Sequence, residues 1–395
     1  MTKKKILWIV YNFTQAGGQR YVYEISKALD KSRYEIDFLK VAPMNHEKDW
    51  EGEFYYERTL ELGCRIYQLS EILPDLASQQ NNSLPYRALG YISRKLNVNL
   101  LPSANDYSND QTARFADLVT FLSGYDHINF SGTSVYHTLF VANGLFYPNA
   151  IVHILTARFQ DPRMYEGFDK QARYNFVSGM REDSIKQELS EFTNYRFTYF
   201  RICFETRPFE IEKKPASHKY SISVFTRLST MKPLDPYFYA LKLLIEEGID
   251  VELNIYGAGD PVALGLRRQL DYLYISKNVN FRGHVEDIPS AIIDETPDLL
   301  WFQSSNSQPA GYAALEISMS GLPQVFWDFM YLGHPHSAKE IFPSFTSLTA
   351  FVNYTRELLE SGELRRNLGE KQREYVLQHY SIRDNIHILE ELFDR

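Results

Sequence analysis

The sequence predicts an α/β protein made of two doubly wound domains, and three features of the chain support this prediction. Its 395 residues exceed what one hydrophobic core usually organises. Short apolar runs alternate with segments of helical periodicity through both halves, which is typical of parallel strands joined by crossover helices. A polar stretch interrupted by proline, residues 211–219, lies between the two series and has the composition of an interdomain linker.

The N-terminal half begins with a strand, a glycine-bearing loop and a helix. The apolar run 6–11 leads into a loop that contains Gly17 and Gly18, and apolar residues then recur at helical spacing. Further strands are predicted at 35–41, 64–69, 127–130, 150–155 and 174–177. This series predicts a first domain over residues 1–210.

A second series of strands and helices follows the linker. Strands are predicted at 221–226, 251–256, 279–281 and 299–303, with helices near 237–247, 261–273 and 311–320. The spacing of apolar residues predicts that the segment 348–395 is helical. We therefore expect a second domain over residues 220–375 and a closing helix over residues 376–395.

Composition excludes several classes of function. The net charge of −8 argues against nucleic acid as the main partner, because nucleic-acid binders need clustered cations. Cys64 and Cys203 lie far apart without ligand-like spacing, so we expect neither disulfides nor a zinc site, as in a reducing cytoplasm. The apolar run near the N-terminus is too short for a signal peptide. We expect a cytoplasmic protein.

Any membrane contact is expected to be peripheral, because no stretch approaches the roughly 18 to 20 apolar residues that span a bilayer. The segment 86–96 places Arg87, Arg94 and Lys95 beside aromatic residues, a pattern of amphipathic helices that rest on lipid headgroups. Such a helix would hold the protein at the inner face of the cell membrane. An ordinary surface helix, whose basic side chains extend into water, explains the same pattern.

Two glycine-bearing junctions are candidates for phosphate binding. In parallel sheets the junction from strand to helix points backbone N–H groups and a positive helix dipole at the carboxyl edge. Gly17 and Gly18 occupy one such junction, and Gly257 and Gly259 occupy another. Neither matches a full dinucleotide fingerprint and no Walker lysine follows, so the glycines alone indicate only a backbone that a ligand can approach.

An ordered series of motifs in the second half resembles the donor-binding domain of retaining GT-B glycosyltransferases, specifically glycosyltransferase family four. The series consists of Phe-Thr-Arg-Leu-Ser-Thr-Met-Lys at 225–232, Leu-Asn-Ile-Tyr-Gly-Ala-Gly at 253–259, Val-Asn-Phe-Arg-Gly-His-Val at 279–285, and Gln-Pro-Ala-Gly-Tyr-Ala-Ala-Leu-Glu at 308–316, continued by Gly321 and Pro323. Weaker similarities in the first half extend the resemblance over nearly the whole chain.

The resemblance implies two Rossmann-like domains that face a central cleft, with a C-terminal helix that crosses back to the first domain. It implies transfer of a sugar from a nucleotide-diphosphate sugar, UDP-sugar favoured, to a glycan, lipid-linked or protein acceptor, as in bacterial polysaccharide biosynthesis. The mechanism would be retaining and would need neither metal nor other cofactor. The implied catalytic residues are Arg227, Lys232 and Gln308. The implied nucleotide-sugar-binding residues are Gly17, Gly18, Gly257, Gly283, His284, Val285, Ala310, Gly311, Tyr312 and Glu316.

The chemistry of these residues suits the roles independently of the resemblance. Cleavage of a sugar–diphosphate bond places negative charge on the leaving group, which cations and N–H donors stabilise. Arg227 can hold phosphate oxygens in a bidentate fork, and Lys232 adds a compact point charge. Glu316 lies near the start of a predicted helix, where its carboxylate is favoured by the dipole and can accept the ribose hydroxyls.

The sequence departs from the family pattern at two places. Gln308 replaces the first motif glutamate, and Ala310 replaces an aromatic residue, so one carboxylate charge is lost. The histidine expected at the end of the fifth strand is absent, and the nearest imidazole, His153, is expected to be buried. These departures keep open a catalytically inactive homologue that serves as a partner or chaperone subunit in a homo- or hetero-oligomer. A sugar-nucleotide epimerase of the same architecture lacks an acid/base cluster to support it.

Overall fold

The structure, a computed structural model, describes residues 2–44, 52–73, 116–143, 146–155, 165–180, 182–212, 219–230, 232–304, 311–328 and 340–395. The chain forms two compact units, Met1–Arg201 with Ile386–Arg395, and Ile202–Asn385. Each unit contains one sheet in which every pair of neighbouring strands is parallel. The predicted fold class, two doubly wound α/β domains, is confirmed.

The first unit is built on a seven-stranded sheet in the order β3-β2-β1-β4-β5-β6-β7. The order reverses between β1 and β4, which are hydrogen-bonded neighbours. Ile6 to Ile9 of β1 are fully buried, as expected for a central strand covered on both faces. The strands are β1 (Lys4–Val10), β2 (Tyr34–Lys40), β3 (Arg65–Gln68), β4 (His127–Phe130), β5 (Ala150–Ile154), β6 (Tyr174–Ser178) and β7 (Tyr195–Tyr199).

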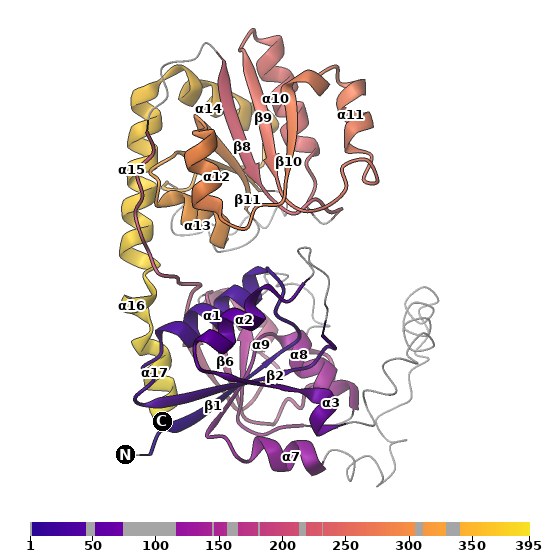
Figure 1. Cartoon of the computed structure of the whole chain (residues 1–395), viewed down its shortest axis with the longest axis vertical. Helices are drawn as coiled ribbons and strands as arrows, with labels where there is room; N and C mark the ends of the chain where they lie inside the picture. The colour runs from indigo at the N-terminus through magenta and orange to yellow at the C-terminus, as the bar shows by residue number, and fades with distance from the viewer. Residues whose placement is uncertain are drawn as a thin grey trace. The chain divides into compact units, whose positions relative to one another are not determined.

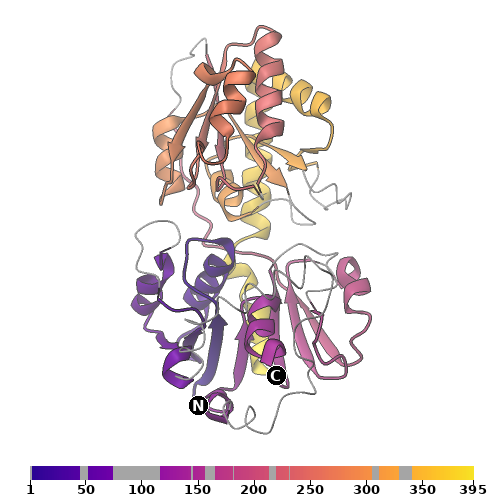
Figure 2. The ribbon, with the colours of Figure 1, turned by 90° about the vertical axis from the view of Figure 1, so that its right-hand side faces the viewer.

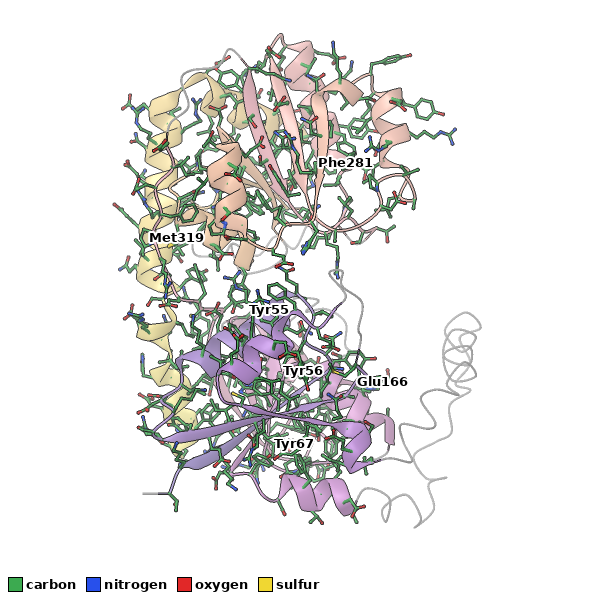
Figure 3. All side chains as sticks on the ribbon, viewed as in Figure 1. Tyr55, Tyr56, Tyr67, Glu166, Phe281 and Met319 are labelled. Atoms are coloured by element: carbon green, nitrogen blue, oxygen red, sulfur yellow. The ribbon has the colours of Figure 1, made fainter. Side chains whose placement is uncertain are left out.

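Helices cover both faces of the first sheet (Figures 1 and 2). Tyr55 of α2 packs on Tyr23 of α1 with their ring centroids 5.3 Å apart, and Tyr56 meets Phe13 edge to face (Figure 3). The first contact joins the two helices that follow β1 and β2, and the second joins α2 to the loop before α1. The helices of this unit are α1 (Gly17–Ala28), α2 (Phe54–Glu61), α3 (Leu69–Ile72), α7 (Ala116–Leu122), α8 (Thr133–Leu139), α9 (Glu182–Leu189) and α17 (His387–Asp394).

The last helix, α17, belongs to the first unit although it closes the chain. The carbonyl oxygen of Phe393 accepts a hydrogen bond from Lys4 Nζ at 2.7 Å and lies 2.6 Å from Nε2 of His127. Leu389 and Phe393 are fully buried against this unit. The C-terminal helix therefore crosses back to the first domain, as the family resemblance implies.

The second unit is built on a six-stranded sheet in the order β10-β9-β8-β11-β12-β13. Its strands are β8 (Tyr220–Phe225), β9 (Val251–Tyr256), β10 (Val279–Gly283), β11 (Leu299–Ser304), β12 (Gln324–Asp328) and β13 (Ser344–Phe345). Its helices are α10 (Asp235–Glu246), α11 (Leu266–Tyr272), α12 (Ile288–Glu295), α13 (Tyr312–Ser318), α14 (Leu348–Glu360), α15 (Gly362–His379) and α16 (Ile382–Asn385). Here the order reverses between β8 and β11.

The hydrophobic core of the second unit lies between its sheet and helices α10 and α14. Tyr237, Trp301 and Phe351 form its aromatic centre, with the rings of Tyr237 and Trp301 stacked at 5.5 Å. Helices α12 and α13 lie on the opposite face of the sheet (Figure 1). This arrangement leaves the second face of β8, β9 and β10 lined by polar side chains rather than by the core.

The chain passes from the first unit to the second after Arg201, earlier than the predicted domain end at residue 210. The segment that follows is bonded to the second unit. Phe209 N donates to the carbonyl oxygen of Met319, and Phe204 pairs with Ser381 in a parallel bridge. The predicted closing helix over 376–395 is divided, since α15 ends at His379 and α16 and α17 follow.

Three strands were not predicted, namely β7, β12 and β13. Strand β7 forms the edge of its sheet and its residues are half-buried or exposed, so it lacks a continuous apolar run. Strand β12 begins with a buried Gln324, and β13 has two residues. The segment 86–96, predicted as an amphipathic helix, lies outside the described residues. Among the helices that the structure describes, we find none with the length and apolar content that crossing a membrane requires.

Candidate functional site

The predicted donor-binding residues follow four neighbouring strands of the second sheet. Arg227 follows β8, Gly257 follows β9, Gly283 ends β10, and Gly311 precedes α13 after β11. All four strands are parallel, so their carboxyl ends meet at one edge of the sheet. The strand order reverses between β8 and β11, and ligands of doubly wound sheets bind at such a reversal. The topology thus brings together residues from widely separated parts of the sequence.

Backbone hydrogen bonds lock the loops after β8, β9 and β10 to one another. Thr226 N donates to Tyr256 O at 2.9 Å, and Leu228 N donates to Ala258 O at 2.8 Å. Gly257 N in turn donates to Gly283 O at 2.8 Å. The three loops therefore form one connected layer at the carboxyl edge.

The glycines of this layer are required by close packing. A Cβ atom on Gly257 would lie 1.7 Å from the carbonyl oxygen of Thr226, and one on Gly259 would lie 2.6 Å from Leu228 Cβ. Any side chain at either position would push the loop that carries Arg227 away. The sequence Gly257-Ala258-Gly259 thus sets how closely the β9 loop packs on the β8 loop.

The two predicted cations lie close together in the connection from β8 to α10. Burial, together with the positive charge of Arg227, lowers the pKa of Lys232. A turn in which Lys232 N donates to Ser229 O at 2.9 Å holds the lysine in place. Gln303 Nε2, at the end of β11, donates to the carbonyl oxygen of Pro233 at 2.7 Å. The cation-bearing loop is therefore attached to both strands at the reversal.

Helix α13 presents Glu316 in its second turn, and Gly311 is its N-cap residue. A Cβ on Gly311 would meet nothing within 4 Å, so packing does not require this glycine. Tyr312 is buried and its hydroxyl donates to the carbonyl oxygen of Cys203 at 3.1 Å, so its side chain is engaged within the second unit. Gln308 and Ala310 lie outside the described residues.

The loop after β10 carries the three residues predicted to contact the base. Gly283 has a φ of +81°, and the β10 register shifts between Phe281 and Gly283. His284 is exposed and Val285 is partly buried. Their main chain follows directly on the carbonyl oxygen that anchors Gly257.

Three polar side chains at this edge were not singled out from the sequence. Among the described residues, Thr226 Oγ1, Ser229 Oγ and Gln303 Oε1 are buried without a hydrogen-bond partner. Buried polar atoms without a protein partner are available to a ligand or to water, and others occur elsewhere among the described residues. The hydroxyl residues that follow Phe225 in the sequence could have indicated Thr226 and Ser229. Gln303 gives no such signal, because in the sequence it looks like the polar end of an apolar strand.

The other predicted glycines, Gly17 and Gly18, lie at the N-terminus of α1 in the first unit. Neither is required by crowding, because a Cβ on Gly17 would meet nothing and one on Gly18 would make only an ordinary contact. The preceding loop is held by Glu53, whose carboxylate accepts from Phe13 N at 2.8 Å and pairs with the buried Lys40 at 2.8 Å. A rigid loop thus leads into an open helix N-terminus.

His153 is fully buried beneath this part of the first unit, as expected. Its Nδ1 lies 2.9 Å from the hydroxyl of Tyr21 and its Nε2 lies 3.0 Å from Oδ1 of Asn129. Burial lowers its pKa to about 3. Both ring nitrogens are engaged within the core, so this imidazole does not substitute for the missing family histidine.

Two further features of the described residues do not point to a site. No group of three or more His, Cys, Asp and Glu side chains is arranged to hold a metal ion in the ranges given above. A hollow of about 360 Å³ is lined by Glu205, Arg207 and Arg383 together with Thr206, Ser381 and Asp384. Both arginines already pair with Glu205 at 2.8 Å, so we do not place the ligand there.

Two doubly wound units, with cations and glycines at the strand-order reversal of the second, define the class of protein: the chain has the GT-B fold of glycosyltransferases. The sequence matches no protein-family model and no curated protein. Solved structures share the fold of this chain over nearly its whole length. HepE of Anabaena in complex with UDP-glucose has 13% sequence identity and a TM-score of 0.65, over 99% of this chain and 100% of that one.

Two other solved structures share the fold over their full length. A variant of S. aureus TarM in complex with UDP shows 12% identity and a TM-score of 0.64, over 99% of this chain and 100% of that chain. Sucrose-phosphate synthase of Thermosynechococcus elongatus shows 14% identity and a TM-score of 0.65, over 99% and 98%. At these identities the likeness establishes the fold.

Proposed function

We propose that the protein is a glycosyltransferase that uses a nucleotide-diphosphate sugar, with a UDP-sugar favoured. The observation that carries the proposal is the grouping of Arg227, Lys232 and the Gly257 loop at the strand-order reversal of the second sheet. The full-length likeness to HepE, solved with UDP-glucose, supports UDP as the nucleotide. The unpartnered polar atoms of Thr226, Ser229 and Gln303 support a ligand at the same edge.

In the proposed reaction the bond between the sugar and the diphosphate breaks, and negative charge develops on the leaving diphosphate. Arg227 would hold phosphate oxygens through its planar guanidinium, and Lys232 would neutralise a second oxygen. The carboxylate of Glu316 would accept hydrogen bonds from the ribose hydroxyls. Because Arg227 and Lys232 repel each other without a ligand, an anion placed between them gains from both.

We propose a retaining mechanism without a metal, in the cytoplasm, and a glycan, lipid-linked or protein acceptor. Activity that survives a chelator would support metal independence, and activity lost with chelator and restored by a divalent cation would contradict it. Analysis of the anomeric configuration of the product by NMR would test retention. The loss of the motif glutamate at Gln308 makes the sugar of the donor the least constrained part of the proposal.

The diphosphate assignment is tested by changing both cations at once. The Arg227→Ala/Lys232→Ala variant should bind UDP at least about 100-fold more weakly, since each charged contact contributes about 1.5–3 kcal/mol. Its unfolding temperature should stay near that of the wild type. Isothermal titration calorimetry with UDP measures the affinity.

A matched control removes two other cations of the same unit, the partly buried Lys242 and the exposed Arg267. The Lys242→Ala/Arg267→Ala variant has the same change in net charge and should keep the UDP affinity of the wild type. If the Arg227/Lys232 variant bound UDP as tightly as this control, the diphosphate site would have to lie elsewhere.

A second candidate function is favoured by the burial of His153 and by Gln308. Both departures remove groups that the family pattern places beside the sugar, so an inactive homologue that acts as a partner or chaperone subunit is the alternative. The two candidate functions differ in whether the protein turns over a nucleotide-sugar. Wild-type protein that binds UDP but neither transfers nor hydrolyses any UDP-sugar in a broad panel would favour the subunit role.

A further inference from the structure

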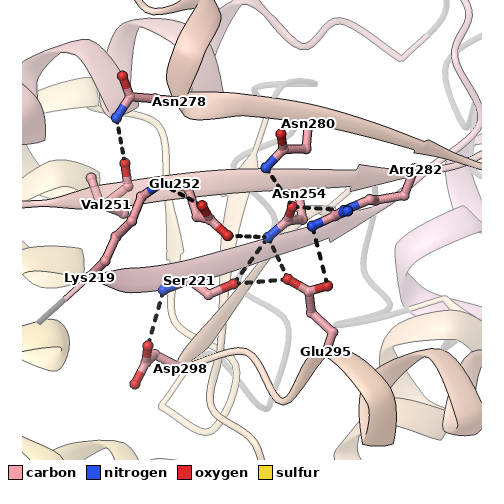
Figure 4. A network of polar contacts seen from close by, with 10 residues as sticks. All are labelled: Lys219, Ser221, Val251, Glu252, Asn254, Asn278, Asn280, Arg282, Glu295 and Asp298. Carbon is pink, nitrogen blue, oxygen red and sulfur yellow. Dashed lines mark hydrogen bonds and ion pairs between the residues drawn. The ribbon is translucent and has the colours of Figure 1, made fainter. Parts of the chain in front are cut away.

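A polar network lies on the face of the second sheet opposite its hydrophobic core (Figure 4). Strand alternation turns Val251, Leu253 and Ile255 of β9 into the core, and turns Glu252, Asn254 and Tyr256 to the other face. Asn254 is fully buried, and the side chain of Glu295, at the end of α12, is only 14% exposed. Burial of this many polar groups is favourable only when they are mutually bonded.

Asn254 uses its whole amide to join three strands to α12. Its Nδ2 donates to Glu295 Oε1 at 2.5 Å and to Ser221 Oγ at 3.1 Å, and one of its two hydrogens is shared with Glu252 Oε1 at 3.3 Å. Its Oδ1 accepts from Asn280 Nδ2 and from Arg282 Nε, both at 3.0 Å. Asn254 therefore fixes the position of the Glu295 carboxylate under the sheet.

Glu295 holds the two residues that directly precede the candidate binding glycines. The hydroxyl of Tyr256 donates to Glu295 Oε2 at 2.8 Å, and Arg282 Nη2 lies 3.8 Å from the same oxygen. Tyr256 is followed by Gly257 and Arg282 is followed by Gly283. One carboxylate thus restrains the ends of both β9 and β10, whose loops are themselves joined by the bond from Gly257 to Gly283.

The restraint extends to the loop that carries the cations. The ring of Tyr256 stacks on the ring of Phe225 with centroids 4.6 Å apart and planes 6° apart. Phe225 is the last residue of β8, two positions before Arg227. A shift of Tyr256 would therefore disturb both the glycine loop above it and the start of the arginine loop beside it.

We infer that Glu295 is a positioning residue for the nucleotide-diphosphate site. It acts through Tyr256 and Arg282, and it sets the geometry of the Gly257 and Gly283 loops without touching the ligand. This inference rests on the proposed function for its consequence in nucleotide binding. Its structural half, the restraint on the two loops, can be measured without any ligand.

Two variants of Glu295 and one matched control test the inference. Glu295→Ala removes every contact, whereas Glu295→Gln keeps the size and one acceptor but loses the charge that faces Arg282. Glu252→Gln is the control, because Glu252 accepts from the same Asn254 amide and from Lys219 yet precedes no candidate loop. All three should remain folded, as judged by circular dichroism and a cooperative thermal transition.

Hydrogen–deuterium exchange measures the loops directly. The amides of Thr226, Leu228 and Gly257 are bonded between loops. In Glu295→Ala the peptides that contain them should exchange about tenfold or more faster, the factor that corresponds to about 1.4 kcal/mol. In Glu295→Gln these peptides should exchange at an intermediate rate, and in Glu252→Gln they should exchange at the wild-type rate. Equal exchange in Glu295→Ala and wild type would overturn the inference.

Titration with UDP tests the consequence for binding. We expect Glu295→Ala to bind UDP about tenfold more weakly at a temperature where it is fully folded, and Glu252→Gln to bind normally. Faster exchange with unchanged UDP affinity would overturn the link from loops to ligand. If wild-type protein itself bound no UDP or other nucleoside diphosphate, the proposed function would fail, and the exchange result would still decide whether Glu295 positions the loops.

Discussion

Lys232 occupies a position that lowers the stability of the second unit. Because its pKa is lowered by burial and by Arg227, the folded state disfavours the charged form that a lysine has near neutral pH. Stability from this group therefore rises as the pH increases through the lowered pKa toward 10.5. A bound diphosphate would reverse the effect, since its charge favours the protonated amine. Under the proposed function, binding of the diphosphate would thus offset the cost of burying this charge.

His153, in contrast to Lys232, is a titratable group that is enclosed in the core of the first unit. Its neutral ring is satisfied by Tyr21 and Asn129, and Trp8 packs beside it with ring centroids 4.6 Å apart. Protonation would place an imidazolium among these groups without water. The burial that prevents a catalytic role also makes the first unit sensitive to acid.

We predict a measurable pH dependence from His153. Its pKa falls from 6.5 in the unfolded chain to about 3 in the fold, so its contribution to stability is present above pH 6.5 and is lost as the pH falls toward 3. Between pH 7.5 and 5.5 the wild type should lose about 1.4 kcal/mol more unfolding free energy than His153→Gln. Urea denaturation at the two pH values measures the difference.

The control for this prediction is His387→Gln, which removes an exposed imidazole. Its pH dependence should follow that of the wild type. A wild-type protein whose stability changes with pH as little as that of His153→Gln would show that His153 is hydrated or protonated in the fold.

At the scale of elements, Gly257, which follows β9, and Gly283, which ends β10, differ in the substitutions that they tolerate. Gly257 is required by the carbonyl oxygen of Thr226, whereas a Cβ on Gly283 would meet nothing within 4 Å. At Gly283 only the φ of +81° disfavours a residue with a side chain. Because Gly257 also has a positive φ, of +158°, the pair compares crowding combined with backbone strain against backbone strain alone.

We predict that Gly257→Ala destabilises the second unit by more than about 3 kcal/mol, because the loops must separate. Gly283→Ala should cost about 1–2 kcal/mol, the strain of a left-handed alanine. Chemical denaturation of both variants gives the comparison, and UDP titration of the folded fraction should show the larger loss for Gly257→Ala. Equal destabilisation by the two substitutions would mean that the loops do not pack as closely as described.

The strands were predictable wherever they are covered on both faces. Continuous apolar runs such as Ile6 to Val10 are typical of strands that are buried on both faces in a parallel sheet. The edge strand β7 has one exposed side, and Gln324 at the start of β12 is buried through bonds to Ala314 and Ser318. A buried polar residue whose amide nitrogen is bonded through tertiary contacts has no signature in a single sequence.

The candidate site was predictable in part for a related reason. Arg227, Lys232 and the glycines stand in motifs that keep the order and spacing of the family pattern. Residue type and order therefore sufficed to select them as candidates. Glu295 and Gln303 act through partners that lie far away in sequence, such as Asn254 and Pro233. Only the pairing of strands places these side chains beside the motifs that they support.

At the scale of the whole molecule, the first unit is completed by the last ten residues of the chain. Segment Ile386–Arg395 contributes Leu389, Leu392 and Phe393 to its interior, together with the carbonyl oxygen that Lys4 binds. The second unit, Ile202–Asn385, is one continuous segment inserted between the two parts of the first. The two units therefore depend differently on the C-terminus.

We predict that deletion of residues 386–395 destabilises the first unit and spares the second. The loss should reach several kcal/mol, since each buried leucine or phenylalanine contributes about 1.5–3 kcal/mol. Hydrogen exchange should accelerate in peptides from β1 and β4 and stay unchanged in β8 and β9. UDP binding at low temperature should persist, because its proposed residues lie mainly in the second unit. Uniform acceleration in both units would contradict this independence.

The parallel bridge between Phe204 and Ser381 also bears on how the protein is made. It joins the beginning and the end of the second unit, so that unit can close on itself once residue 385 has emerged from the ribosome. The first unit, although its first strands are translated earlier, is completed only when α17 has followed the second unit out of the ribosome. The unit that is begun first is thus completed last, and its sheet lacks the contacts of α17 until the whole second unit has been made.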